Sequence, residues 1–142
     1  MPADRPTDVD FKPFAETDGF IGHNGPYFWA KEASGEFVYG FQSDARHGNP
    51  NNVLHGAAIT AFVDTFLGHA VVANTGRPCA TVALTLQFVG GVATGHWITG
   101  KARIREVTRT MAFLDAEVRS GDRLLLTATS IFKLFEPRSR DT

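Results

Sequence analysis

The sequence predicts an α+β domain in which a curved antiparallel sheet wraps around one long, buried helix. Between His55 and Asn74 nearly every residue is apolar, on all faces of a helix, which is typical of a helix enclosed by the rest of the protein. After this helix, apolar and polar residues alternate in segments joined by short turns, as in antiparallel strands. One face of such a sheet needs cover, and this helix is the element available to supply it.

The elements are expected in a simple order. Residues 1–18 are polar and proline-dotted, so we expect a mobile arm or a loosely docked first turn. A single domain then covers 19–136, and a charged tail occupies 137–142. In chain order we expect a strand at 36–43, the helix at 55–74, and strands at 80–89, 96–107, 110–119 and 123–135. The last four strands are expected to form a meander of sequential neighbours.

The strand at 80–89 has the clearest alternation. Its apolar face is predicted to carry Val82, Leu84, Leu86 and Phe88. Thr81 falls on the opposite face in this pattern, where a strand residue can simply face solvent.

Composition excludes several classes of protein. At 142 residues, with 43% apolar and 20% charged residues, the chain is a soluble globular domain rather than a disordered one. A net charge of −1 gives no electrostatic case for a nucleic-acid partner or an anionic membrane. The apolar helix is interrupted by Asp64, so we expect no membrane span. A single cysteine, Cys79, and no N-terminal apolar segment favour the cytoplasm.

Asp64 is the most informative residue of the chain. A carboxylate is seldom buried in apolar surroundings, because losing its water costs several kcal/mol unless a partner replaces it. It could be satisfied by Thr60, one turn earlier, by a basic residue of the sheet, or it could serve a reaction. The helix start at His55-Gly56, two turns away, follows a polar loop and presents unpaired backbone N–H groups. Together they form a plausible active site.

These residues resemble the hotdog-fold acyl-CoA thioesterases, specifically the phenylacetic-acid-degradation (PaaI-like) branch. The resemblance rests on a loop Asn49, then His55-Gly56 opening the central helix, then Asp64 two turns in. Gly25-Pro26 followed by aromatic residues is similar to the family's entry segment, and the similarity covers roughly residues 25–135. It implies hydrolysis of acyl-CoA to a carboxylic acid and free coenzyme A.

The resemblance also implies roles for single residues. Asp64 would be the general base that activates water, or the nucleophile that forms a mixed anhydride. The Gly56 N–H would stabilise the charge that develops on the thioester oxygen, although Gly56 could instead only permit a tight helix entry. Asn49 would orient the attacking group, although Asn before Pro is also ordinary turn chemistry. Thr81 matches a Ser/Thr position that helps to hold the water.

Two further residues are candidates for substrate binding. His55 opens the helix, and we expect its ring to hydrogen-bond the loop rather than to act as a base. Arg109 is a candidate for the phosphates of coenzyme A, because guanidinium groups bind phosphate well. One strand carries a basic residue at every second position, namely Lys101, Arg103 and Arg105. This pattern favours a solvated face of the sheet. The five histidines lack metal-ligand spacing, so no metal and no cofactor are expected.

The sequence departs from the family pattern at two positions. Asn52 replaces the loop glycine, and we expect it to keep the left-handed conformation that Asn tolerates. Ala57 replaces the second glycine of the helix start, and its methyl group is expected to narrow the approach to the thioester. These departures keep open an alternative function, a non-catalytic hotdog module that binds acyl thioesters or serves assembly.

A second copy of the chain is expected as a partner. One sheet face can cover only about half of a helix that is apolar all round. A homodimer that extends the sheet and pairs the helices would bury the remainder. The resemblance extends this to a homotetramer, a dimer of dimers, with each site shared between two subunits.

Overall fold

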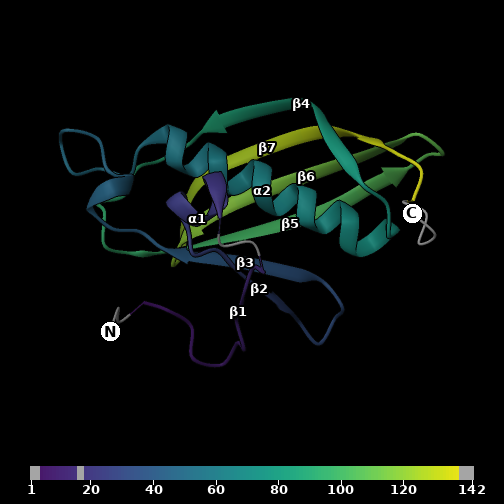
Figure 1. Cartoon of the computed structure of the whole chain (residues 1–142). Helices are drawn as coiled ribbons and strands as arrows, with labels where there is room; N and C mark the ends of the chain where they lie inside the picture. Colours follow the sequence, from purple (N-terminus) through teal and green to yellow (C-terminus); the bar gives the residue numbers. More distant parts are fainter. Residues whose placement is uncertain (1–3, 16–17, 138–142) are drawn as a thin grey trace.

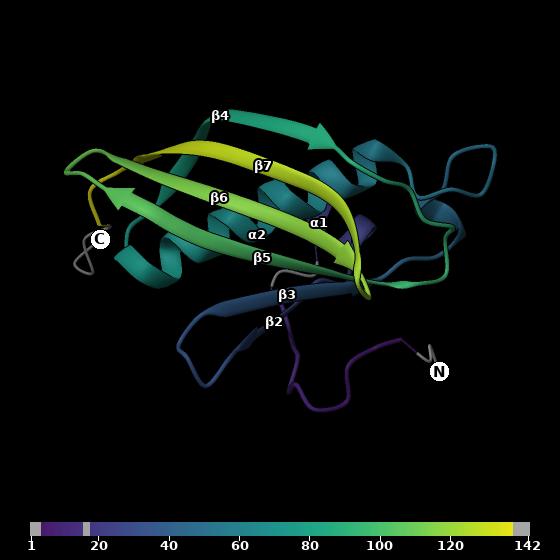
Figure 2. The same cartoon turned by 180° about the vertical axis from the view of Figure 1, so that it is seen from behind.

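A computed structural model describes residues 4–15 and 18–137 of the chain. It shows a seven-stranded antiparallel sheet that curves around one long helix (Figures 1 and 2), which is the hotdog arrangement that the sequence predicts. The helices are α1 (Gly19–Asn24) and α2 (Gly56–Thr75), with a 3₁₀ turn at Ala45–His47. The strands are β1 (Lys12–Pro13), β2 (Phe28–Lys31), β3 (Phe37–Gln42), β4 (Cys79–Phe88), β5 (Trp97–Val107), β6 (Met111–Ser120) and β7 (Arg123–Leu134).

The central helix α2 has the bounds that its composition predicts. It begins after His55 and ends at Gly76, which adopts the left-handed conformation (φ 69°) that glycine allows at a helix end. By length and composition alone it could cross a membrane, but it is the core helix of this domain. Seven of its residues are buried, namely Ile59, Phe62, Val63, Phe66, Leu67, Ala70 and Val71. The rest of its circumference is not fully covered by this chain.

The expected meander of four strands is wrong in one respect. Strands β5, β6 and β7 are sequential neighbours, but β4 pairs with β7 at the edge of the sheet and not with β5. The reason is the segment between Phe88 and Trp97, which is too long for a tight hairpin. It crosses the end of the sheet and binds the loop before α2, where the Leu54 N–H donates to the Val92 carbonyl (2.8 Å).

An aromatic layer fixes α2 on the sheet. Phe37, Tyr39 and Phe41 share the face of β3 that meets the helix, as their alternation predicts. The Tyr39 ring stacks on Phe66 of α2 with the ring centroids 4.9 Å apart, and burial raises the pKa of Tyr39. Gly100 of β5 permits this close approach, because a Cβ there would lie 2.3 Å from the Phe66 ring.

The described part of the N-terminal arm is docked on the sheet, one of the two arrangements expected for it. Phe11 and Phe14 are buried. The Arg5 guanidinium lies 4.7 Å from the centroid of the Trp97 ring. The Asp4 carboxylate accepts a hydrogen bond from the Trp97 N–H (3.0 Å). The predicted tail at 137–142 lies almost wholly outside the described residues.

Candidate active site

The N-terminus of α2 presents one free backbone donor. The His55 side chain caps the helix, because its Nδ1 accepts a hydrogen bond from the Ala57 N–H (2.9 Å). The ring was expected to hydrogen-bond the loop, but its bond is instead to the first turn of the helix. Among the described residues the Gly56 N–H has no acceptor, and it lies at the positive end of the helix dipole. The backbone therefore keeps a donor available for an oxygen that gains negative charge.

Asp64 is held by a residue of the sheet. Thr81 of β4 donates a hydrogen bond from Oγ1 to Asp64 Oδ1 (2.7 Å). Thr60, expected as one of two structural partners, instead donates to the Gly56 carbonyl (2.8 Å). No basic side chain in the described part of the chain forms an ion pair with Asp64, so the other expected structural partner is also not found. The carboxylate is oriented by Thr81, and no cation neutralises it.

A bulge in β4 places Thr81 beside Asp64. The register of β4 on β7 shifts between Thr81 and Ala83, so Val82 is the extra residue. The shift reverses the alternation that the sequence predicts: Thr81 shares the helix-facing side with Leu84, whereas Val82 is 55% exposed. The predicted apolar face was therefore wrong at Val82, and the predicted side of Thr81 was wrong for the same reason.

Asp64 and Thr81 lie in an open cavity of about 580 Å³ between α1, α2 and β4. The remaining lining residues are Phe20, Ala57, Thr60, Ala61 and Leu84. Apolar side chains therefore surround the carboxylate. Cys79 is close enough for Asp64 to influence it, since burial and, to a smaller extent, the Asp64 charge raise the pKa of the Cys79 thiol. A raised pKa keeps this thiol protonated and unreactive.

The loop before α2 is organised by Asn49. Its Oδ1 accepts hydrogen bonds from the N–H groups of Asn51 (2.9 Å) and Val53 (3.1 Å), which is the turn chemistry weighed for this residue. Asn52 has the left-handed conformation expected of it (φ 61°). Asn49 Nδ2 makes no recorded hydrogen bond among the described residues, so it remains available to a bound group.

Arg109 lies away from these residues. It sits in the turn between β5 and β6, at the end of the sheet near the C-terminus of α2, whereas Gly56 opens the other end of that helix (Figure 1). Its carbonyl accepts a hydrogen bond from Arg77 (2.8 Å). One chain does not bring Arg109 to the N-terminus of α2.

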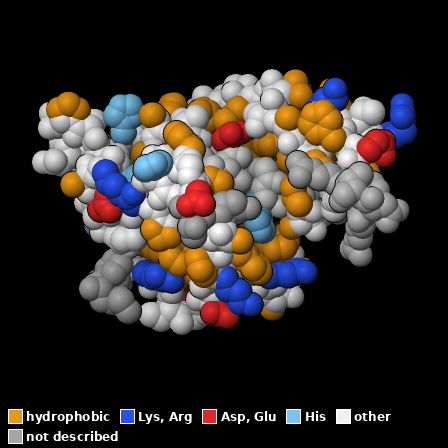
Figure 3. All heavy atoms as spheres, in the orientation of Figure 1, with side chains coloured by type: hydrophobic (Ala, Val, Ile, Leu, Met, Phe, Trp, Pro, Cys, Tyr) orange, Lys and Arg blue, Asp and Glu red, His pale blue; other side chains and the backbone are white. Residues whose placement is uncertain are grey.

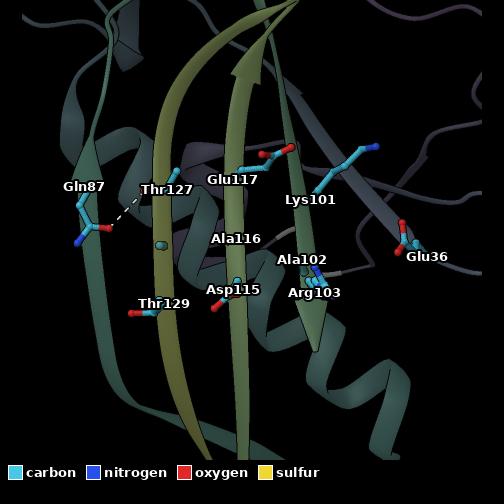
Figure 4. A pocket seen from close by; sticks show the side chains of 11 residues that line it. Glu36, Gln87, Lys101, Ala102, Arg103, Asp115, Ala116, Glu117, Thr127 and Thr129 are labelled. Carbon is cyan, nitrogen blue, oxygen red and sulfur yellow. Dashed lines mark hydrogen bonds between the residues drawn. The ribbon is translucent and has the colours of Figure 1, made fainter. Parts of the chain in front are cut away.

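A second hollow lies on the outer face of the sheet, away from α2. Figure 4 shows side chains from neighbouring strands in a row across it, including Lys101, Glu117, Thr127 and Gln87. Two basic residues of this face have acidic partners, since Arg105 pairs with Asp115 (2.6 Å) and Lys101 with Glu32 (3.5 Å). This agrees with a solvated sheet face. Across the described ranges, no three His, Cys, Asp or Glu side chains gather as a metal site.

Phe20 is a cavity residue that no pattern in the sequence indicates. It lies on α1, a helix of six residues that the pattern of the sequence does not predict, and it reaches the cavity only through tertiary contacts of α1. No motif surrounds it.

Comparison with known proteins identifies the family. Residues 51–127 match the model of the thioesterase superfamily. The chain belongs to the thioesterase superfamily. The matched stretch contains Gly56 and every residue named as lining the cavity except Phe20.

Relatives agree with this membership. "Putative esterase PA0474" of Pseudomonas aeruginosa is 29% identical over 126 residues, covering 87% of this chain and 94% of that protein. The Escherichia coli PaaI protein from the phenylacetic acid degradation operon has the same fold, with a TM-score of 0.75 and 16% identity over 84% of this chain and 87% of that chain. A hypothetical thioesterase from Streptococcus pneumoniae, crystallised with coenzyme A, also has this fold. Its TM-score is 0.72 and its sequence identity 20%, over 80% of this chain and 88% of that chain. Such similar scores do not single out one branch of the superfamily.

Proposed function

We propose that this thioesterase superfamily member hydrolyses an acyl-CoA thioester to a carboxylic acid and free coenzyme A. The observation that carries the proposal is the oriented carboxylate of Asp64, hydrogen-bonded by Thr81 in an apolar cavity and unpaired with any described cation. A carboxylate held in this way can take a proton from water or attack a carbonyl carbon itself. The coenzyme A in the Streptococcus pneumoniae structure supports the choice of thioester.

The reaction needs two kinds of group. Asp64 Oδ1 is occupied by Thr81, so the second carboxylate oxygen would act on the water or on the thioester. As the C–O bond forms, the carbonyl oxygen becomes negative, and the free Gly56 N–H would stabilise it. The C–S bond then breaks, and the thiolate of coenzyme A takes up the proton that Asp64 removed from the water. If Asp64 attacks the thioester itself, the thiolate leaves with a proton from solvent, and water then hydrolyses the anhydride to the carboxylic acid and free Asp64. In this scheme Asn49 Nδ2 orients the attacking group and His55 fixes the helix start.

Two copies of the chain are needed to complete this site. Gly56 and Asp64 are eight residues apart on α2, so their Cα atoms are separated by about 12 Å along the helix axis. One thioester group cannot contact both within one chain. We propose a homodimer in which the N-terminus of α2 from one subunit faces Asp64 of the other.

The surface around β4 supports this homodimer. β4 is an edge strand, and three apolar side chains at or beyond it, Val82, Phe88 and Val89, are each more than half exposed. An unpaired edge with exposed apolar residues is a place where a second copy can extend the sheet. Figure 3 shows apolar side chains along the upper edge of the molecule, where β4 lies in Figure 1, and a denser group of them in its lower middle. We further propose that two such dimers pair into a tetramer and that the chain belongs to the PaaI-like branch. Arg109 is also proposed to bind a phosphate of coenzyme A.

A panel of acyl-CoA substrates tests the proposed function. The purified chain is expected to release free thiol from at least one aliphatic or aromatic acyl-CoA, at a rate proportional to enzyme concentration. Binding of the same compounds is measured in parallel by calorimetry. Binding without thiol release across the panel would instead indicate the acyl-thioester binding module.

A further inference from the structure

Phe20 is a large apolar side chain that remains 66% exposed at the mouth of the Asp64 cavity. It stands on α1, opposite the α2 residues Ala57 and Ala61. An exposed phenyl ring in this position gains little by burial within the chain. It can gain by contact with a bound apolar group.

The helix that carries Phe20 is fastened at its C-terminal end. Arg46 donates hydrogen bonds to the carbonyls of His23 and Gly25. His47, which is buried, accepts the Asp44 N–H at Nδ1, so its Nε2–H donates to the Asn24 carbonyl (2.7 Å). These bonds join α1 to the segment that leads into the Asn49 loop. The C-terminal end of α1, which follows Phe20 by one turn, is therefore fixed relative to the candidate active site.

Both hydroxyl groups that line the cavity already donate a hydrogen bond within the chain. The Thr60 hydroxyl donates to the Gly56 carbonyl (2.8 Å), and the Thr81 hydroxyl donates to Asp64 (2.7 Å). The other lining side chains, apart from Asp64, are apolar. Among the described residues of one chain that line this cavity, the amide groups of a pantetheine arm would find no free side-chain donor. An unsubstituted hydrocarbon group fits these walls better.

We infer that Phe20 forms the wall of the subsite for the acyl group and that it selects apolar acyl groups long enough to reach its ring. This inference rests on the proposed thioester hydrolysis. On this inference a hexanoyl or phenylacetyl group contacts the ring of Phe20, whereas an acetyl group, with one carbon beyond the carbonyl, does not. Contact that is equal in the ground state and the transition state lowers KM and leaves kcat unchanged.

The test compares acetyl-CoA with hexanoyl-CoA in wild type, Phe20→Ala and Phe20→Leu. Phe20→Ala is expected to lower the ratio of kcat/KM for hexanoyl over acetyl about tenfold, mainly through a higher KM for hexanoyl-CoA. Phe20→Leu is expected to restore part of the ratio. Phe135→Ala is the matched control: its ring is also exposed, but it lies over the Lys133 ammonium group, away from the cavity. This variant is expected to keep the wild-type ratio.

A ratio that stays within twofold of wild type in a folded Phe20→Ala variant would overturn the inference and leave the proposed function intact. If the wild type releases no thiol from any acyl-CoA, the proposed function fails instead. Binding of two non-hydrolysable thioethers, hexyl-CoA and ethyl-CoA, then still tests whether Phe20 contacts the longer apolar group. An unchanged Kd ratio between these compounds in Phe20→Ala overturns it, and a loss of the preference for hexyl-CoA supports it.

Discussion

At the scale of single residues, Asn49 combines two tasks that substitutions can separate. Its Oδ1 holds the loop through two backbone N–H groups, while its Nδ2 is the atom proposed to orient the attacking group. Asp at this position keeps the oxygen acceptor and removes the N–H₂ donor. Ala removes both.

Asn49→Asp is therefore expected to lower kcat about a hundredfold with little change in thermal stability. Asn49→Ala is expected to lower the free energy of unfolding as well, by about 1–3 kcal/mol, because two backbone donors lose their acceptor. Steady-state kinetics and urea denaturation of both variants check this. A folded Asn49→Asp enzyme with wild-type kcat would show that Asn49 only stabilises the loop and does not orient the attacking group.

Single residues also show how far sequence reasoning reaches. Asp64 could be predicted because a carboxylate inside an apolar helix is costly without a partner or a task. Its partner Thr81 could be named only through the resemblance, since the alternation of β4 placed it on the wrong face. A bulge is a local register shift with no composition signal here, and it decides which side chain reaches Asp64.

At the scale of elements, α2 and β3 could be predicted because their apolar patterns are long and regular. The pairing of β4 with β7 could not be predicted. The length of the segment between β4 and β5 allows it to cross the sheet, but it does not specify which strand β4 pairs with. The short elements α1, β1 and β2 owe their place to tertiary contacts, as the bonds from Arg46 and His47 to the end of α1 show.

The aromatic layer between β3 and α2 makes the element packing sensitive to alkaline pH. Tyr27 packs against Phe41 and Phe62 in this layer, and burial raises its pKa to about 12. A group whose pKa is raised by folding stabilises the fold below its unfolded pKa of about 10, and this contribution is lost as the pH rises towards the folded pKa. The free energy of unfolding should therefore fall between pH 9 and pH 11, by about 1 kcal/mol from Tyr27.

Urea denaturation of wild type and Tyr27→Phe at both pH values measures this contribution. The phenylalanine variant cannot titrate at this position, so its stability should fall less over the same interval. Tyr39, whose pKa is also raised, is present in both proteins and cancels in the comparison. Identical pH dependence in the two proteins would show that Tyr27 makes no such contribution.

At the scale of the whole molecule, the separation of Gly56 and Asp64 along α2 requires a site shared between two chains in the proposed mechanism. Asn49→Asp and Asp64→Asn should each silence every site of their own homodimer. A heterodimer of the two contains one site with both residues intact. Random exchange of subunits in an equal mixture should then restore about a quarter of wild-type activity.

Sedimentation of the wild type and mass spectrometry of the mixture establish that dimers and heterodimers are present. Heterodimers that form and stay inactive would contradict the shared site. A chain that sediments as a monomer at micromolar concentration would contradict the homodimer itself.

The central claim is that Asp64 carries out thioester hydrolysis, and Asp64→Asn tests it most directly. The amide is nearly isosteric, and its oxygen can still accept the hydrogen bond from Thr81, so the fold should be retained. Thiol release from the preferred acyl-CoA is expected to fall at least about a hundredfold in kcat, in a variant with the wild-type thermal midpoint. Unaltered turnover in that folded variant would contradict the claim.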